Sequence, residues 1–259
     1  MSTARSPRVR PVRYPLSDGK PMAETGIHAE NLINLIDVLR THFEGQDVFA
    51  WGNMFVYYVE GDPKKVVAPD VFVALGVSAQ TDRQVYFAWV EGKLPDLVIE
   101  LTSRSTRRQD TGPKFRLYQD VLRIPEYILF DPLEDYLKPS LQGFRLVGGQ
   151  YVPIPEVGGR LRSDVLGLEF GREGHSLKLY DPNTGERLLT SKERADRIEQ
   201  QRQRAEQERQ RAEQERQRAE AEARALAERL AQVDAERAQL LAELERLRRS
   251  QGERSSPGS

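Results

Sequence analysis

The chain of 259 residues contains no cysteine. This absence excludes disulfide bonds, thiolate catalysis and zinc sites built from cysteine. Only three histidines are present, so a histidine-rich metal centre is excluded as well. No apolar run reaches the roughly 18 to 20 residues that a membrane-spanning helix needs. The basic N-terminus MSTARSPRVRPVRYP has no apolar segment of the kind found in secretory signals. We therefore expect a cytoplasmic protein without a membrane segment.

An excess of charge is also missing, because the net charge is −1. Overall charge therefore gives no support for nucleic-acid binding, and only a local basic patch could provide it. The sequence contains no G-x-S-x-G motif, P-loop or dinucleotide-binding fingerprint. The serines of SRST (103–106) have no convincing histidine and aspartate partners, which argues against a serine hydrolase.

The composition divides the chain into four segments. Residues 1–20 are rich in proline and arginine and are predicted to be a disordered arm. Residues 21–190 are long enough for one well-buried domain. From about residue 191 the composition shifts to Arg, Glu, Gln and Ala, which predicts a charged helix over 191–249 and a disordered tail over 250–259.

Hydrophobic periodicity predicts an α/β (α+β) domain. A helix is expected over about 26–44 and a second over about 111–123, capped by Asp110 or Thr111. The apolar stripe of the second helix is formed by Leu117, Tyr118, Val121 and Leu122. Strands are expected at 53–60, 66–75, 84–90, 96–101 and 126–132, and a β-meander at 142–190. This order predicts a central mixed sheet flanked by helices.

Two acidic residues lie at or inside apolar strand patterns. Asp70 opens the second half of VVAPDVFVAL, where alone it would indicate only a turn. Glu100 lies inside DLVIEL, where an unpaired carboxylate would be costly. Lys114 follows near the start of the next helical pattern. Two carboxylates and a lysine are suited to holding a divalent metal beside a phosphodiester. A buried salt bridge from Glu100 to Lys114 or to an arginine is the structural alternative.

Other polar residues could support this site. Asp96 shares a strand face with Glu100, and His28 begins the first helix, where capping or packing is the alternative role. The basic loop that follows Glu100 could contact phosphates, although a solvated loop is the default interpretation. Its arginines are Arg104, Arg107 and Arg108.

The C-terminal segment repeats every seven residues. One heptad position holds Ala205, Ala212, Ala219, Leu226, Val233, Leu240 and Leu247. The complementary position holds Arg202, Arg209, Arg216, Ala223, Leu230, Arg237 and Leu244. The second half, over about 223–249, is a fair coiled-coil seam through which the chain could form a homo-oligomer. A solvated single helix is an equal alternative, because Arg and Glu four residues apart support a helix without a partner.

The stretches KKVVAPDVFVALGV (64–77) and PDLVIELTSRSTRRQDTGPKFRLYQDVLRIPEYILFDP (95–132) resemble the Uma-two family of restriction-endonuclease-like proteins. That family belongs to the PD-(D/E)XK nuclease superfamily, and the resemblance extends over about residues 20–180. It implies a mixed β-sheet flanked by helices and a phosphodiesterase site that uses Mg²⁺ or Mn²⁺.

The resemblance also implies roles for single residues. Pro69 and Asp70 match the PD element, and Glu100 matches the second acidic position. Thr102 stands where the superfamily expects lysine, and Lys114 on the following helix takes that place. The acidic residue that the first helix can supply is Glu24 or Glu30.

Two hypotheses for function follow. In the first, the protein is a Mg²⁺-dependent endonuclease that cleaves DNA, with Asp70 and Glu100 as metal ligands and Lys114 as the third catalytic residue. In the second, the nuclease-like core is a non-catalytic scaffold, and the C-terminal coiled coil joins it to protein partners.

Overall fold

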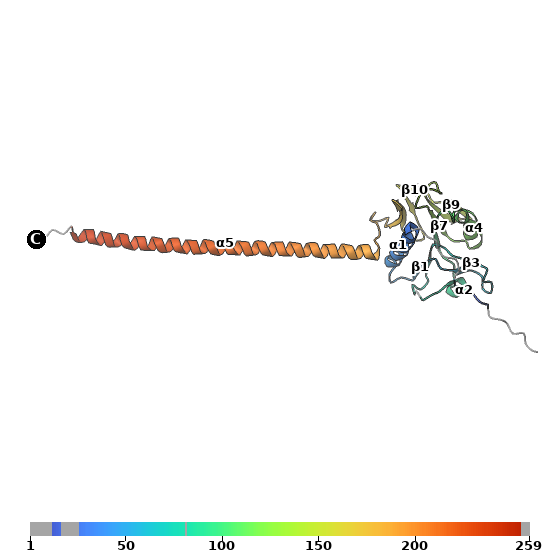
Figure 1. The fold of residues 1–259 in the computed structure, drawn as a ribbon, viewed down its shortest axis with the longest axis horizontal. Helices are drawn as coiled ribbons and strands as arrows, with labels where there is room; N and C mark the ends of the chain where they lie inside the picture. The colour runs from blue at the N-terminus through green and yellow to red at the C-terminus, as the bar shows by residue number, and fades with distance from the viewer. Residues whose placement is uncertain (1–11, 17–25, 81, 255–259) are drawn as a thin grey trace, which may run out of the picture. The chain divides into compact units, whose positions relative to one another are not determined.

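The computed structural model describes residues 12–16, 26–80 and 82–254, with side chains up to residue 247 in the last range (Figure 1). The chain divides into two compact units, Met1–Arg194 and Ala195–Ser259, and each is considered by itself. No helix among the described residues combines the length and the apolar character that a membrane span requires.

The first unit is built on a six-stranded sheet in the order β1-β4-β6-β7-β8-β9. Its strands are β1 (Val48–Gly52), β4 (Val71–Leu75), β6 (Leu97–Leu101), β7 (Glu126–Phe130), β8 (Leu141–Val147) and β9 (Gln150–Pro153). The β6–β7 pair is parallel and the other pairs are antiparallel. Both central strands, β6 and β7, are buried along their whole length, as expected for a sheet covered on both faces. The predicted mixed sheet flanked by helices is therefore confirmed.

Two smaller sheets complete this unit. One has the order β10-β11-β12-β13, and the other the order β3-β2-β5. The first is formed by β10 (Glu156–Val157), β11 (Arg160–Arg162), β12 (Glu169–Glu173) and β13 (Ser176–Tyr180). The second is formed by β3 (Val66–Val67), β2 (Val56–Tyr57) and β5 (Tyr86–Phe87). The meander predicted at 142–190 thus contributes to two sheets.

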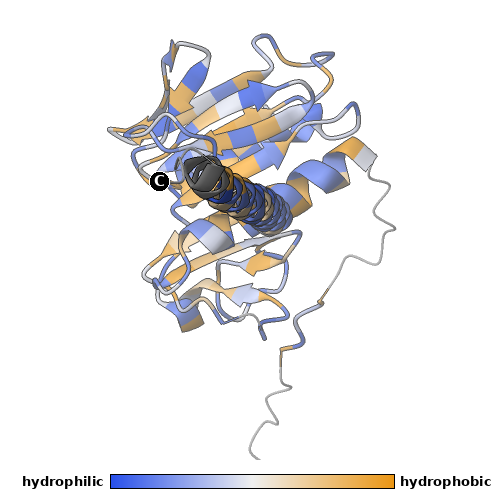
Figure 2. Ribbon diagram, turned by 90° about the vertical axis from the view of Figure 1, so that its left-hand side faces the viewer, coloured by the Kyte–Doolittle hydropathy of each residue, from blue (hydrophilic) through white to orange (hydrophobic). Residues whose placement is uncertain are grey.

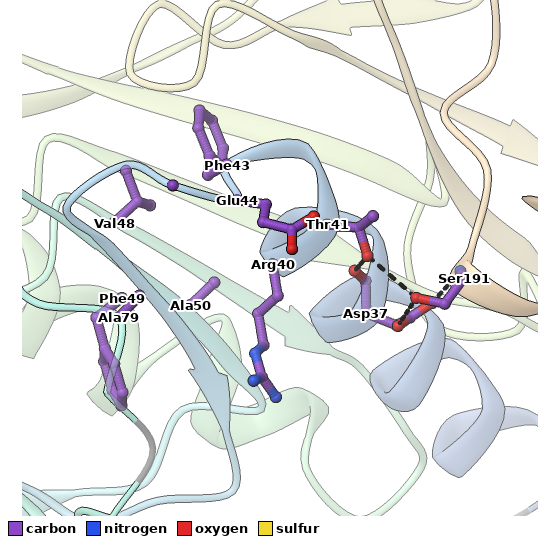
Figure 3. Close-up of a pocket in the computed structure, with 11 residues that line it drawn as sticks. Asp37, Arg40, Thr41, Phe43, Glu44, Val48, Phe49, Ala50, Ala79 and Ser191 are labelled. Carbon is purple, nitrogen blue, oxygen red and sulfur yellow. Dashed lines mark hydrogen bonds between the residues drawn. The ribbon is translucent and has the colours of Figure 1, made fainter.

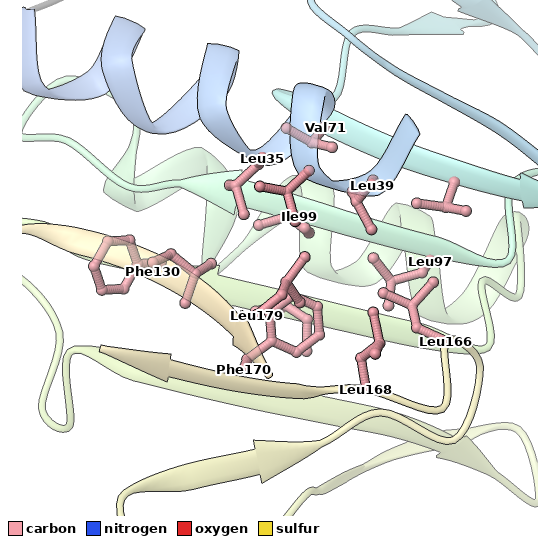
Figure 4. Close-up of a cluster of buried hydrophobic side chains, with 14 of the residues drawn as sticks. Leu35, Leu39, Val71, Leu97, Ile99, Phe130, Leu166, Leu168, Phe170 and Leu179 are labelled. Carbon is pink, nitrogen blue, oxygen red and sulfur yellow. The ribbon is translucent and has the colours of Figure 1, made fainter. Parts of the chain in front are cut away.

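Two apolar clusters form the core of this unit. In one, Leu35 and Leu39 of helix α1 (Gly26–His42) pack with Ile99 of the central sheet and Phe170 of β12 (Figure 4). Figure 2 shows apolar residues interspersed with hydrophilic ones in the sheets of this unit. Burial of these side chains, at about 25 cal/mol per Å² of apolar surface, is the main stabilising contribution.

Helix α1 is fastened to β13 by one side chain. The Asn31 amide donates to the carbonyl oxygens of Ile27 (2.9 Å) and His175 (2.9 Å). Its oxygen accepts the N–H of Leu177 (2.8 Å). Asn31 is buried, so these three bonds satisfy the whole amide where water cannot.

Several predicted strand boundaries were wrong. The strand at Val48–Gly52 was not predicted, and the one expected over 53–60 is reduced to Val56–Tyr57. Asn53 separates them with φ 49°, a left-handed conformation that ends a strand. The strand predicted over 66–75 is broken before β4, where Pro69 has no N–H for pairing. The strand predicted over 84–90 is short because helix α2 (Ala88–Glu91) follows β5 at once.

The helix predicted over 111–123 is divided into two short segments, and a third precedes it. These are α3 (Arg107–Asp110), α4 (Pro113–Arg116) and the π-helical turn η1 (Leu117–Val121). Gly112, with φ −127° and ψ −94°, separates α3 from α4. Asp110 ends α3 instead of capping the next helix, and α3 occupies part of the predicted basic loop.

Both ends of the chain differ in part from the predicted disorder. Residues 12–16 of the N-terminal arm are described, and the Tyr14 ring lies 5.0 Å from that of Tyr57 and 5.1 Å from that of Phe87. Helix α5 (Ser191–Arg254) continues through residues 250–254, which were assigned to a disordered tail.

Candidate active site

Three elements bring the predicted residues together. Asp70 immediately precedes β4, Glu100 lies in β6, and Lys114 lies in α4. The antiparallel register pairs Val71 with Ile99, so Asp70 and Glu100 lie side by side. The backbone N–H of Asp70 donates to Glu100 Oε2 (3.3 Å), and the N–H of Leu101 donates to Asp70 Oδ2 (2.7 Å). Each carboxylate thus accepts a hydrogen bond from the backbone of the segment that carries the other one.

Glu100 is fully buried and contacts two further donors. The Tyr118 hydroxyl donates to Oε1 (2.7 Å), and the Lys114 ammonium lies 2.8 Å from Oε2. Both oxygens are therefore held by side chains, which makes Glu100 the most firmly positioned group of the site.

Lys114 connects Glu100 to a third carboxylate, Asp110. Its ammonium lies 3.6 Å from Asp110 Oδ1 and donates to the carbonyl of Ala68 (3.4 Å). Asp110 is fully buried, and in the described part of the chain neither of its carboxylate oxygens has a hydrogen-bond partner. The Lys114 ammonium therefore lies between two buried carboxylates, those of Glu100 and Asp110, and does not balance their combined charge.

The pKa values follow from this excess. Burial raises the pKa of Glu100 to about 8; Lys114 opposes the shift, and Asp70 and Asp110 add to it. Burial also raises the pKa of Asp110, against the opposing effect of Lys114. For Lys114, burial alone would lower the pKa, but the three carboxylates outweigh it and raise the pKa, so the ammonium stays charged at neutral pH.

The residues present fit a divalent cation. No group of three or more His, Asp or Glu side chains in the described ranges is arranged to hold a metal. Mg²⁺, however, is commonly held by one or two carboxylates, with water and substrate phosphates as its other ligands. Asp70 and Glu100 are the two carboxylates that could hold it, and the negative charge that the three carboxylates place around the single Lys114 ammonium favours an added cation.

Two members of this cluster escaped the sequence-based assignment of the site. Asp110 was considered only as a helix cap, although its spacing of four residues from Lys114 could have indicated a pair on one helical face. Tyr118 was assigned to the apolar stripe of the helix, whereas its hydroxyl reaches Glu100. It lies in the π-helical turn, a feature often found at functional sites, for which the sequence carries no signal.

The other predicted site residues lie in different places. His28 Nε2 is 3.7 Å from Asp70 Oδ1, so it adjoins the cluster. Asp96 lies beyond the opposite end of β6, where it accepts the N–H of Leu75 (2.7 Å) and pairs with Lys93 (2.7 Å). Glu30 is exposed on α1, and Glu24 lies outside the described residues.

The three arginines of the predicted basic patch are exposed. Arg104 lies in the turn after β6, and Arg107 and Arg108 lie in α3. Arg107 is placed 5.6 Å from the centre of the Tyr136 ring. All three follow Glu100 within the segment that leads to Lys114.

A separate pocket of about 400 Å³ lies around the C-terminal end of α1 (Figure 3). Arg40, Phe43 and Phe49 are among its lining residues. Asp37 accepts hydrogen bonds from the backbone N–H and the hydroxyl of Ser191, both at 2.6 Å. No residue of the carboxylate cluster lines this pocket, so it is distinct from the candidate active site.

Gly52 controls the backbone position of Asp70. A Cβ atom at residue 52 would lie 2.2 Å from the Asp70 carbonyl oxygen and 2.9 Å from Ile36 Cδ1. Because the first neighbour is backbone, Gly52→Ala is expected to displace Asp70 and to destabilise the protein by about 1–3 kcal/mol. Thermal unfolding measures this effect. Gly26→Ala is the control, since a Cβ there meets nothing within 4 Å; equal stability of both variants would contradict the prediction.

Comparison with known proteins gives a structural match and a family match. A search of curated proteins finds no match. The crystal structure of “a putative nuclease belonging to DUF820 from Anabaena variabilis ATCC 29413” shares 16% sequence identity with the chain. The match has a TM-score of 0.42 and covers 58% of this chain and 81% of that chain. Residues 4–178 match the Uma2 family, described as “Putative restriction endonuclease”. This match spans more than half of the sequence, and the chain belongs to the Uma2 family.

Proposed function

We propose that the protein is a Mg²⁺-dependent endonuclease that hydrolyses phosphodiester bonds of DNA, and that Mn²⁺ can replace Mg²⁺. The observation that carries the proposal is the buried Glu100, which lies beside Asp70 with the Lys114 ammonium 2.8 Å from its Oε2. An acidic pair and a lysine are brought together from three separate elements, at a cost that a purely structural core would avoid by using apolar residues.

Asp70 and Glu100 would hold the cation through their carboxylate oxygens. When bound, Mg²⁺ makes a water molecule more acidic and neutralises charge on the scissile phosphate. The chain itself fixes the ligands: the Leu101 N–H holds Asp70 Oδ2, and the Tyr118 hydroxyl holds Glu100 Oε1. Such fixed ligands need little rearrangement during the reaction, which is the main advantage of a preorganised site.

Lys114 would stabilise the negative charge that develops on the phosphate oxygens. Its ammonium is buried among carboxylates, and the raised pKa keeps it protonated. The exposed arginines Arg104, Arg107 and Arg108 would contact phosphates of the nucleic-acid backbone. Backbone contacts of this kind position a duplex without reading its sequence.

Metal titration tests the site directly. We expect isothermal titration of Mg²⁺ or Mn²⁺ to give binding heat with the wild type and none with the Asp70→Ala/Glu100→Ala variant. Asp96→Ala is the matched control, because Asp96 is paired with Lys93 away from the cluster. Binding retained by the double variant would show that Asp70 and Glu100 do not hold the metal. If the wild type binds neither ion, even with duplex DNA present, the scaffold hypothesis replaces this one.

The alternative, a nuclease-like scaffold without catalysis, is favoured by one observation. Lys114 already compensates part of the charge of Glu100, so the cluster is a salt bridge that can exist without a metal. A plasmid-nicking assay with Mg²⁺ distinguishes the two functions. A nuclease cleaves as the wild type and loses this activity in Glu100→Gln. A scaffold shows no cleavage either as the wild type or as Glu100→Gln.

A further inference from the structure

The second half of α5 exposes a row of large apolar side chains. Leu226, Leu230, Leu240 and Leu247 are 66%, 63%, 62% and 55% exposed, and Val233 and Leu244 are 56% and 52% exposed. Residues 199–222 of the same helix contain no large apolar residue. That part is supported within the helix by bonds such as Gln210 to Glu206 (3.1 Å) and Gln217 to Glu213 (3.0 Å). From residue 199 to residue 247 of α5, the large exposed apolar side chains thus all lie within residues 223–247, and Ile198 lies apart from them near the start of the helix.

These apolar residues follow one heptad register. The a positions are Ala223, Leu230, Arg237 and Leu244, and the d positions are Leu226, Val233, Leu240 and Leu247. Alternating steps of three and four residues place all eight on one stripe of the helix, the geometry of a two-stranded seam. The outer f positions hold Glu228, Ala235 and Ala242. The outer side therefore carries no large apolar residue, and Leu241, at the e position that adjoins the stripe, is also exposed.

We propose that this stripe binds a second copy of the same chain and forms a parallel two-stranded coiled coil over residues 223–247. In a parallel pair, each g position faces the e position five residues later in the other copy. Arg229 at g then faces Asp234 at e of the second copy, and the reverse pair forms by symmetry. Charge complementarity across the seam thus selects a copy of this helix as the partner.

The antiparallel alternative brings like charges together. When the helices run in opposite directions with the same apolar residues stacked, e faces e and g faces g. Asp234 then meets Asp234 of the second copy and Glu236 meets Glu236, while Arg229 meets Glu243 in an attractive pair that occurs twice. The like-charge pairs are destabilising, and the parallel arrangement brings no like charges together at its e and g positions.

Arg237 is the one charged residue at an a position of this stripe. In the parallel pair Arg237 lies opposite Arg237 of the second copy, a like-charge contact that costs stability. It also lies beside Glu236 at the preceding g position of that copy, so its guanidinium can turn to a carboxylate at the edge of the seam. A polar a residue favours a defined register and a low oligomer state, because a larger bundle would bury the charge. Arg237 therefore favours two strands in register.

The mass of the full-length protein tests the interface. Sedimentation equilibrium is expected to show a concentration-dependent species with twice the chain mass of 29.6 kDa. Leu240→Asp, at d, is expected to return the protein to the single-chain mass. Ala235→Asp, at f, carries the same new charge and is expected to remain dimeric. A single-chain mass for the wild type at all concentrations, or a dimer unaffected by Leu240→Asp, would overturn the proposal.

The absence of cysteine gives a direct test of direction. Ala223→Cys, at a, is expected to form an interchain disulfide under mild oxidation, because a parallel pair places residue 223 against itself. Ala235→Cys, on the outer face, is expected not to do so. A dimer in which Ala223→Cys fails to cross-link would contradict the parallel arrangement. Neither test depends on the proposed nuclease activity, since both report mass.

Discussion

Glu100→Gln is expected to reduce DNA cleavage at least about 10³-fold while the protein stays folded. The amide keeps the size of the side chain and can still contact the Tyr118 hydroxyl, but it lacks the charge that a divalent cation requires. Cleavage of a supercoiled plasmid in excess Mg²⁺ measures this loss. Unchanged cleavage would remove Glu100 from the active site.

Glu126→Gln is the matched control. Glu126 is also a buried carboxylate and lies on β7, the parallel neighbour of the Glu100 strand. Its oxygens are fully used, by the Asp164 N–H (2.9 Å), the Ser163 hydroxyl (2.5 Å) and the Arg145 guanidinium (3.1 Å). Glu126→Gln is therefore expected to lower thermal stability, whereas Glu100→Gln lowers activity. This contrast separates a structural carboxylate from a functional one.

The same Glu100→Gln variant has a distinct pH signature in EDTA. The folded pKa of Glu100 is raised by burial from its ordinary value near 4.5 to about 8. Because the folded state binds this proton more tightly than the unfolded state, the wild type loses stability as pH rises from about 4.5 to about 8. The amide that replaces the carboxyl group has no proton to lose, so the stability of the variant is expected to fall less steeply over this range. If the free energy of unfolding fell by the same amount from pH 5 to pH 8 in the wild type and in Glu100→Gln, this prediction would be contradicted.

Lys114→Met is the second change with a large expected effect. Cleavage is expected to fall about 10²- to 10³-fold, because the proposed role of Lys114 is to stabilise charge on the phosphate oxygens. The metal-free protein is expected to lose about 3–5 kcal/mol of stability, since Glu100 and Asp110 lose their shared cation. Urea denaturation in EDTA measures the stability, and the plasmid assay measures the activity.

Metal affinity is expected to rise in Lys114→Met, although cleavage falls. The Lys114 ammonium contacts Glu100 Oε2, so its removal frees this oxygen for Mg²⁺. Because Lys114 also lowers the pKa of Glu100, the comparison is made well above pH 8, where Glu100 is ionised without it. Tighter metal binding with slower cleavage is therefore the expected combination. Arg116→Met, an exposed basic residue of the same short helix, controls for a general loss of positive charge. Weaker metal binding in Lys114→Met than in Arg116→Met would contradict the assigned role.

The sequence allowed the main acidic groups to be predicted because their surroundings were unusual. Glu100 interrupts an apolar run, and Asp70 follows a proline at the start of another; the structure places both at one end of adjacent strands. Lys114 was predicted through the loop that returns the chain to that end, and its ammonium does lie beside Glu100. Strand alternation predicted which face of the sheet these acidic residues share, but not how far apart they lie along the strand. Asp96 was therefore grouped with Glu100 although it pairs with Lys93.

The remaining parts of the site depend on backbone geometry that residue patterns do not encode. The break at Gly112 and the π-helical turn orient Asp110 toward Lys114 and Tyr118 toward Glu100. Periodicity assumed one regular helix there and assigned Tyr118 only to packing. The strand Val48–Gly52 was missed because the predicted strand was taken to begin at Asn53, the left-handed residue that instead follows β1.

The bonds of Asn31 to residues 175 and 177 have a consequence for the order in which the protein is made. Synthesis runs from the N-terminus, so α1 leaves the ribosome long before β13 exists to receive the Asn31 side chain. The helix that carries His28 to the edge of Asp70 is therefore fully fastened only when nearly the whole first unit has been translated. An incomplete product that ends before His175 lacks these bonds, so the placement of His28 beside Asp70 is secured only late in synthesis.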